Sequence, residues 1–170
     1  MTRRDDRETA SIRESAERLL KNPETPDDIA RANLMLGCAG EKEANFDVAV
    51  ECYSKVVAAQ PLDPRIRYFG NNNLGYSLVQ LGRFGEAEGF CQAAIRINPE
   101  QYNAHKNLGL VRQGQERWLD AALCFAEACR VCPVEPRARH LLDGLIAAHP
   151  DLVSRSEELQ QAIISLDPIN

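Results

Sequence analysis

The sequence has 170 residues, of which 44% are hydrophobic and 26% charged, and its formal net charge is −5 at pH 7. This composition is ordinary for a globular protein and excludes a disordered chain, and the length favours one compact domain. Residues 1–21 lack the apolar stretch of a signal peptide, and no run approaches the roughly 18 apolar residues of a membrane-spanning helix. We therefore expect a cytoplasmic protein with no membrane partner.

The N-terminal region, residues 1–25, is predicted to form a charged tail followed by one helix over residues 9–21. Ser11 and Glu14 have the spacing of a capping box at the start of this helix. A proline-containing break follows. Thr25 then has the character of an N-cap and Pro26 that of a first helical residue, which predicts the start of the next helix.

Between residues 74 and 133 the sequence contains the same pattern twice. Each matching pair is separated by 34 residues, and a fixed period of this length indicates a stacked repeat architecture. The pairs are Leu74 and Leu108, Gly75 and Gly109, Phe84 and Trp118, Ala87 and Ala121, Ala94 and Ala128, and Pro99 and Pro133.

Each repeat is predicted to be a pair of helices. Gly82 separates the first helix from the second, which Phe84 opens. Ala87 and Ala94 are small enough to let the helices approach to about 8 Å. Pro99 ends the pair, because proline cannot continue a helix.

A third repeat lies upstream, with Leu36 and Gly37 as its leading pair, Phe46 as its aromatic residue and Pro61 as its end. The spacing from Gly37 to the next repeat glycine is 38 residues, which predicts one extra turn in the following helix. Asp63 and Pro64 provide an N-cap and a first helical residue for that helix, expected over residues 64–81. The extra turn carries Ile66, Tyr68 and Phe69.

After Pro133 the repeat pattern weakens. Helices are predicted over residues 137–148 and 154–166, the second entered by a capping box of Ser154 and Glu157. A stack of repeats needs an atypical end unit with a polar outer face. Residues 134–170 are therefore interpreted as a capping helix pair, or as a degenerate fourth repeat.

A leucine–glycine pair, an aromatic residue, two alanines and a closing proline in one register resemble the tetratricopeptide repeat family. The resemblance implies an all-α solenoid of about three helix pairs, with an N-terminal helix and a C-terminal capping helix pair. The implied repeats are residues 26–61, 62–99 and 100–133.

In this family the first helices line a concave groove, and the resemblance assigns a peptide-binding role to the residues at those positions. Asn73 and Asn107 occupy the same place in successive repeats, and we expect them to form a ladder of amides that each donate and accept hydrogen bonds. The family's clamp for a terminal carboxylate is not expected, since only Asn73 fits its pattern. The implied groove residues are Asn72, Asn73, Tyr76, Asn103, Lys106, Asn107, Leu110, Gln113, Arg137 and His140.

Six cysteines raise the alternative of a metal or redox site. Cys129 and Cys132 have CxxC spacing, and Cys124 precedes them. A zinc site needs four converging ligands, and a redox site needs thiols of low pKa. Core packing is the favoured interpretation, because the cysteines fall mainly at inward helix positions. No metal, cofactor or disulfide is expected.

The sequence contains no motif for nucleophilic catalysis or phosphate binding, which predicts a protein without enzymatic activity. Its central part is only slightly basic, short of the clustered charge that nucleic-acid binding requires. The predicted function is a protein-interaction adaptor that binds a peptide or protein segment in the groove. One alternative is a self-associating scaffold, a homo-oligomer with contacts through the N-terminal helix or the exposed ends of the stack, where Ile66, Tyr68 and Phe69 could take part. The other is a small secretion or assembly chaperone.

Overall fold

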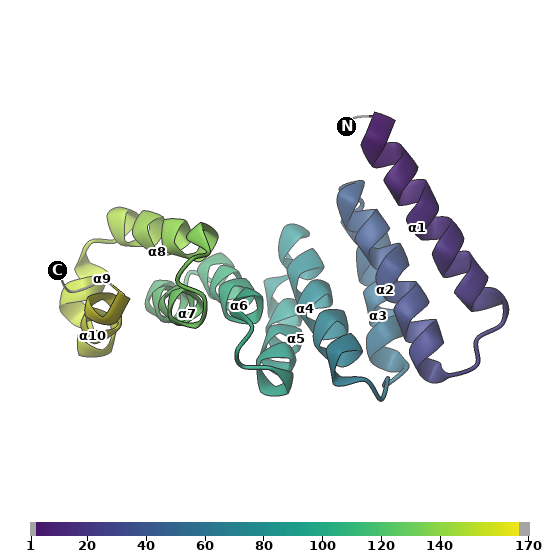
Figure 1. The fold of residues 1–170 in the computed structure, drawn as a ribbon. Coiled ribbons are helices and arrows are strands. Elements are labelled where there is room, and N and C mark those ends of the chain that lie inside the picture. The colour runs from purple at the N-terminus through teal and green to yellow at the C-terminus, as the bar shows by residue number, and fades with distance from the viewer. Residues whose placement is uncertain (1–2, 167–170) are drawn as a thin grey trace. The chain divides into compact units, whose positions relative to one another are not determined.

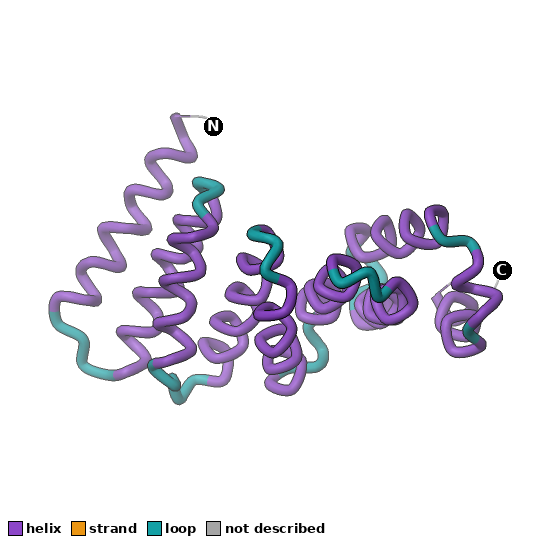
Figure 2. Tube along the Cα trace, turned by 180° about the vertical axis from the view of Figure 1, so that it is seen from behind, coloured by secondary structure: helices purple, strands orange, loops and turns teal. Residues whose placement is uncertain are grey.

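The computed structural model describes residues 3–166, with side chains from residue 7 onward (Figure 1). Within this range the chain forms ten helices and no strand, joined by short loops (Figure 2). The all-α repeat architecture predicted from the sequence is confirmed. The helices are α1 (Arg3–Lys21), α2 (Pro26–Lys42), α3 (Phe46–Ala58), α4 (Pro64–Gln80), α5 (Phe84–Ile97), α6 (Tyr102–Gly114), α7 (Trp118–Val131), α8 (Pro136–Ala148), α9 (Asp151–Arg155) and α10 (Glu157–Leu166).

The helices group into two compact units, Met1–Arg83 and Phe84–Asn170, rather than the single domain expected from length. The division falls between α4 and α5, inside the predicted repeat over residues 62–99. Each repeat of a solenoid contacts only the adjacent repeats, so a chain of this kind can divide into more than one compact unit. The repeat boundaries themselves stay predictions. The ends of the predicted terminal segments, residues 1–2 and 167–170, lie outside the described part.

In the first unit, α1 packs on α2, α2 on α3, and α3 on α4 (Figure 1). Tyr53 of α3 is fully buried at the centre, and Gly37 of α2 faces its ring. A Cβ atom added to Gly37 would lie 2.4 Å from Cε1 of Tyr53. The repeat glycine is therefore required, because any side chain there would separate the two helices.

Two helix starts in this unit agree with the sequence. Thr25 accepts a hydrogen bond from the backbone N–H of Asp28, whose carboxylate accepts one from the backbone N–H of Thr25. Asp63 caps α4 by accepting from the N–H of Arg65 at 2.7 Å. Side chains with an oxygen close to the backbone satisfy amide groups that the first helical turn leaves free.

The predicted capping box of Ser11 and Glu14 is wrong. Helix α1 begins at Arg3, so Ser11 lies inside the helix, where its carbonyl accepts a hydrogen bond from the Ser15 hydroxyl at 2.9 Å. The packing of α1 against α2 extends the helix toward its N-terminus. The ion pair between Lys42 of α2 and Glu8 of α1 lies within this extension.

The extra turn of α4 is present, but most of it is not available for self-association. Ile66 is 6% exposed and Tyr68 is 4% exposed, because the turn packs into the unit. Phe69 is the exception among the three aromatic or aliphatic residues of this turn, at 49% exposed. The alternative of self-association through Ile66, Tyr68 and Phe69 together is therefore wrong, because the first two side chains are buried.

In the second unit, α6, α7, α8, α9 and α10 surround one apolar core. Helix α10 packs on α7, and Leu159 of α10 is fully buried there. The buried core residues are Ala121, Ala122, Phe125, Ala126, Leu142, Leu145, Leu152 and Leu159. The terminal helices thus complete the core of this unit.

The predicted capping box of Ser154 and Glu157 is also wrong. A short helix, α9, forms after Pro150, and the Ser154 hydroxyl donates to the carbonyl of Asp151 at 2.9 Å. Ser156 instead caps α10 by accepting from the N–H of Leu159 at 3.1 Å. The later cap is selected because it places Leu159 in the core.

Candidate peptide-binding surfaces

Asn72, Asn73 and Tyr76 lie together on α4, and we call them the α4 face. Asn72 is 8% exposed, and its side-chain amide donates to the side-chain oxygen Oδ1 of Asn73 at 2.9 Å. The Asn73 amide in turn donates to the hydroxyl of Tyr53 on α3 at 3.3 Å. Asn73, a predicted groove residue, therefore also holds α4 against α3.

Tyr53 connects this face to α2. Its hydroxyl donates to the thiol of Cys38 at 3.4 Å. Burial, together with the nearby Glu41 carboxylate, raises the pKa of Tyr53 well above its ordinary value. The hydroxyl therefore stays protonated as part of a polar network between three helices.

Glu41 belongs to the same region and was missed in the sequence analysis. The hydroxyl of Ser77 on α4 donates to its carboxylate at 3.0 Å, and burial raises the pKa of Glu41. Its only sequence signal was its position three residues after Cys38, which places both on one side of α2. Tyr76 lies nearby in sequence and packs edge-on against Phe46, with 6.3 Å between ring centroids.

In the second unit, Asn103, Lys106 and Asn107 lie on α6. The Lys106 ammonium donates to the side-chain oxygen Oδ1 of Asn103 at 3.2 Å and lies 6.0 Å from the centroid of the Tyr102 ring. Lys106 is only 9% exposed, and Asn107 only 2%. Burial lowers the pKa of Lys106, and the positive charge of Arg137 lowers it further.

Arg137 of α8 is brought to the start of α6 by two partners. Its guanidinium donates to the Glu135 carboxylate at 2.7 Å and to the Tyr102 hydroxyl at 2.8 Å. That hydroxyl donates to the other Glu135 oxygen at 3.0 Å. The hydrogen bonds from Arg137 lower the pKa of Glu135 to about 2, so the carboxylate is ionised at neutral pH.

The α6–α8 cluster comprises Tyr102, Asn103, Lys106, Glu135 and Arg137. Tyr102 and Glu135 were not identified from sequence. Glu135 did carry a signal, since it precedes a proline at a helix start as Asp63 does, and it caps α8. The cluster holds two cations and one carboxylate, a net positive charge.

The other predicted residues lie elsewhere on these helices. Leu110 packs against the core of the second unit, and Gln113 is half-buried on α6. His140 is exposed on α8 and makes no hydrogen bond to a residue in the described range. The ladder of Asn73 and Asn107 stays a prediction, because these residues belong to different units.

Two cysteines of the second unit are buried packing side chains. Cys91 is fully buried and Cys129 is 5% exposed. Burial raises the pKa of Cys91 to about 12 and that of Cys124 to about 11, the opposite of a reactive thiolate. Across residues 3–166, no three His, Cys, Asp or Glu side chains are grouped so as to hold a metal ion. In the same part of the chain, no helix is long and apolar enough to cross a membrane.

Helix pairs that stack through small residues define a class of all-α repeat protein. The family model for the tetratricopeptide repeat matches residues 34–102 and, in a second overlapping match, residues 72–136. These matches cover more than half of the sequence. The chain belongs to the tetratricopeptide repeat family.

One curated relative is the inactive TPR repeat-containing thioredoxin TTL3 of Arabidopsis thaliana, 28% identical over 116 residues. The match covers 67% of this chain but only 16% of the relative, so this chain corresponds to a small part of that relative's length.

Solved structures share the fold at low sequence identity. The first TPR domain of human RPAP3 has a TM-score of 0.62 and 21% identity, and the match covers 81% of this chain and 94% of that domain. The first TPR of Spaghetti (RPAP3), bound to the HSP90 peptide SRMEEVD, has a TM-score of 0.65 and 21% identity over 75% of this chain and 98% of that one. The Hsp90 co-chaperone Cns1 of Saccharomyces cerevisiae has a TM-score of 0.71 and 20% identity over 85% of this chain and 46% of that one.

Proposed function

We propose that this chain is a non-catalytic adaptor that binds an acidic segment of another protein along its first-helix surfaces. The segment would contact the α6–α8 cluster of the second unit, and the α4 face of the first unit is a separate surface for contact with a partner. The proposal requires no metal, cofactor or nucleic acid, and it places the protein in the cytoplasm.

The observation that carries the proposal is the charge of the α6–α8 cluster. Lys106 and Arg137 bring two cations to the start of α6 and α8, and Glu135 supplies one carboxylate. A buried ammonium is costly to keep charged unless hydrogen bonds and opposite charge compensate it. A carboxylate from a partner would add a second negative charge beside Lys106 and Arg137 and form short, charge-assisted hydrogen bonds.

Two further observations support an acidic protein partner. Asn103 supplies an amide beside Lys106, and an amide can pair with the backbone of an extended segment. The related TPR of Spaghetti is bound to a peptide, SRMEEVD, whose side chains include three carboxylates. A few such bonds at about 1 kcal/mol each, with apolar contacts made by the same segment, would give roughly micromolar affinity.

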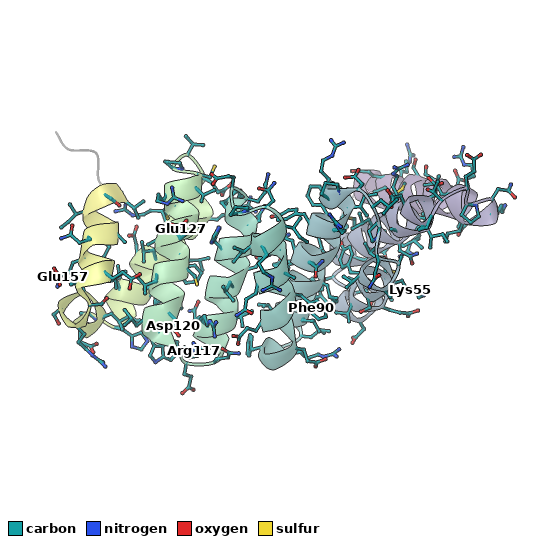
Figure 3. The ribbon with its side chains drawn as sticks, turned by 90° about the horizontal axis from the view of Figure 1, so that it is seen from below. Lys55, Phe90, Arg117, Asp120, Glu127 and Glu157 are labelled. Atoms are coloured by element: carbon teal, nitrogen blue, oxygen red, sulfur yellow. The ribbon has the colours of Figure 1, made fainter. Side chains whose placement is uncertain are left out.

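Affinity capture from a lysate of the source organism tests the proposal, using wild type and the double variant Lys106→Met/Arg137→Gln. Arg130→Gln is the matched control, because Arg130 is an exposed arginine of α7 that pairs with Glu127 outside the cluster (Figure 3 labels Glu127). We expect a protein that wild type and the control retain and the double variant loses. Equal recovery by all three would refute the role of the cluster. Light scattering on the same samples measures whether self-association takes the place of a partner.

A further inference from the structure

The pocket between the end of α3 and the start of α4 is separate from the first-helix surface of the proposed function. It has a volume of about 350 Å³ and is lined by Val57, Gln60, Pro61, Arg67 and Asn71, all in the first unit. We call it the Arg67 pocket. Successive helical residues are about 100° apart, so residues 67 and 71 lie on the opposite side of α4 from residues 73 and 76.

Arg67 gives the pocket an uncompensated positive charge. Its side chain is exposed and forms no ion pair with any residue of the described range. The neighbouring cations are engaged elsewhere: Arg65 lies 3.8 Å from Asp63, and Lys55 of α3 pairs with Glu51 at 2.7 Å (Lys55 is labelled in Figure 3). A planar guanidinium is suited to a carboxylate, which it binds through two parallel hydrogen bonds.

The amide side chains around Arg67 suit a peptide ligand. Gln60 lies in the loop after α3 with a positive φ of 46°, and its backbone N–H donates to the carbonyl of Val57 at 3.3 Å. Its exposed side-chain amide provides a donor for the second carboxylate oxygen. The Asn71 amide donates to the Arg67 backbone carbonyl at 2.8 Å, and an amide oxygen is able to accept from a peptide N–H. Val57 and Pro61 form the apolar wall.

An exposed apolar residue with a held backbone follows the pocket-lining Pro61 in the chain. Leu62 follows Pro61 and is 82% exposed. The Asp27 carboxylate of α2 accepts hydrogen bonds from the backbone N–H of Leu62 at 2.7 Å and of Asp63 at 3.1 Å. Because the backbone is already held, ordering Leu62 against a ligand costs less entropy than ordering a free loop.

We propose that the Arg67 pocket is a second binding site, which takes an acidic and apolar segment of a partner protein. A Glu or Asp carboxylate of the segment binds Arg67 and Gln60, and an adjacent apolar side chain packs on Leu62. A single cation matches the single charge of a carboxylate, whereas a phosphate group carries a charge of about −1.5 to −2 and pairs best with several arginines. The volume lies near the lower end of the range for ligand sites, roughly 300–1,000 Å³, which fits part of a peptide.

Nuclear magnetic resonance of the ¹⁵N-labelled full chain tests this site. The probe is a peptide with blocked ends that alternates Glu and Leu, and its counterpart with Gln in place of Glu is the control ligand. We expect the acidic peptide to shift the side-chain resonances of Arg67, Gln60 and Asn71. Losing charge-assisted bonds in Arg67→Gln should weaken binding by about tenfold or more. The matched variant Arg65→Gln, a neighbouring exposed arginine outside the pocket lining, should change affinity by roughly twofold at most.

Three results would overturn the proposal: unchanged affinity in Arg67→Gln, no shift of the three side chains at saturating peptide, or inorganic phosphate displacing the peptide from them. Both arginines are exposed, so neither substitution is expected to unfold the chain, and circular dichroism checks this. The same titration on Lys106→Met/Arg137→Gln keeps this proposal distinct from the proposed function. The Arg67 pocket should bind equally well in that variant, whatever the capture experiment finds.

Discussion

Replacing Gly109 with alanine tests the close approach of α6 and α7. A Cβ atom at this position would lie 2.4 Å from Cε1 and 2.5 Å from Cδ1 of Phe125, where ordinary contacts are 3.4–4 Å. The Phe125 ring is fully buried in the core of the second unit, so it cannot swing into solvent. The added methyl group must therefore displace either the ring or the helix.

The magnitude follows from two opposing terms. Alanine in place of glycine stabilises a helix interior by about 1 kcal/mol, whereas forcing an extra methyl group into a packed core costs about 1–3 kcal/mol. We expect Gly109→Ala to lower the free energy of unfolding by about 1 kcal/mol. Gly89→Ala on α5 is the matched control, because no atom lies within 4 Å of its added Cβ. It should gain about 1 kcal/mol, so the two variants differ by about 2 kcal/mol.

Urea unfolding followed by far-UV circular dichroism measures both free energies, provided that the denaturant slopes match. Equal stability of Gly109→Ala and Gly89→Ala would refute the close approach of the two helices. A second test combines Gly109→Ala with Phe125→Leu. If the clash is the cause, the smaller side chain should make the double variant more stable than the sum of the two single effects predicts.

Two other substitutions have predictable effects on stability. Lys106→Met should raise the free energy of unfolding by about 1 kcal/mol at neutral pH, because it removes a buried ammonium. The folded-state pKa of Lys106 is lowered, so the unfolded chain binds more protons in the alkaline range below 10.5 and wild-type stability rises there. The difference in free energy of unfolding between Lys106→Met and wild type should therefore shrink at alkaline pH. Urea unfolding at neutral and alkaline pH measures it, and a difference that stayed constant would contradict this expectation. Asp27→Ala should cost about 1–2 kcal/mol, since it removes two hydrogen bonds to the loop at Leu62. The control is Asp47→Ala, at an exposed acidic residue in the first turn of α3, which should lower the free energy of unfolding less in the same assay. An equal loss in both variants would contradict the role of the loop contact.

The sequence by itself determined the repeat register and several helix starts. Gly37 faces the Tyr53 ring and Gly109 the Phe125 ring, each with a ring carbon 2.4 Å from an added Cβ, so the repeat glycine marks a place where two helices must meet closely. Thr25 and Asp63 could be assigned because a cap acts on backbone groups two or three residues away. These features depend on neighbours in sequence or on one repeated contact.

Tertiary structure decided what depends on contacts between residues far apart in the chain. Ser154 and Ser156 are both suitable caps, and the burial of Leu159 selects Ser156. The burial of Ile66 follows from how the extra turn of α4 packs. The link between Tyr102 and Arg137 spans 35 residues, and the Arg67 pocket joins the end of one helix to the start of the next. Periodicity predicts which faces of the helices are buried. It does not predict which polar side chains meet there, because their partners and exposed fractions are set by the packing of whole helices.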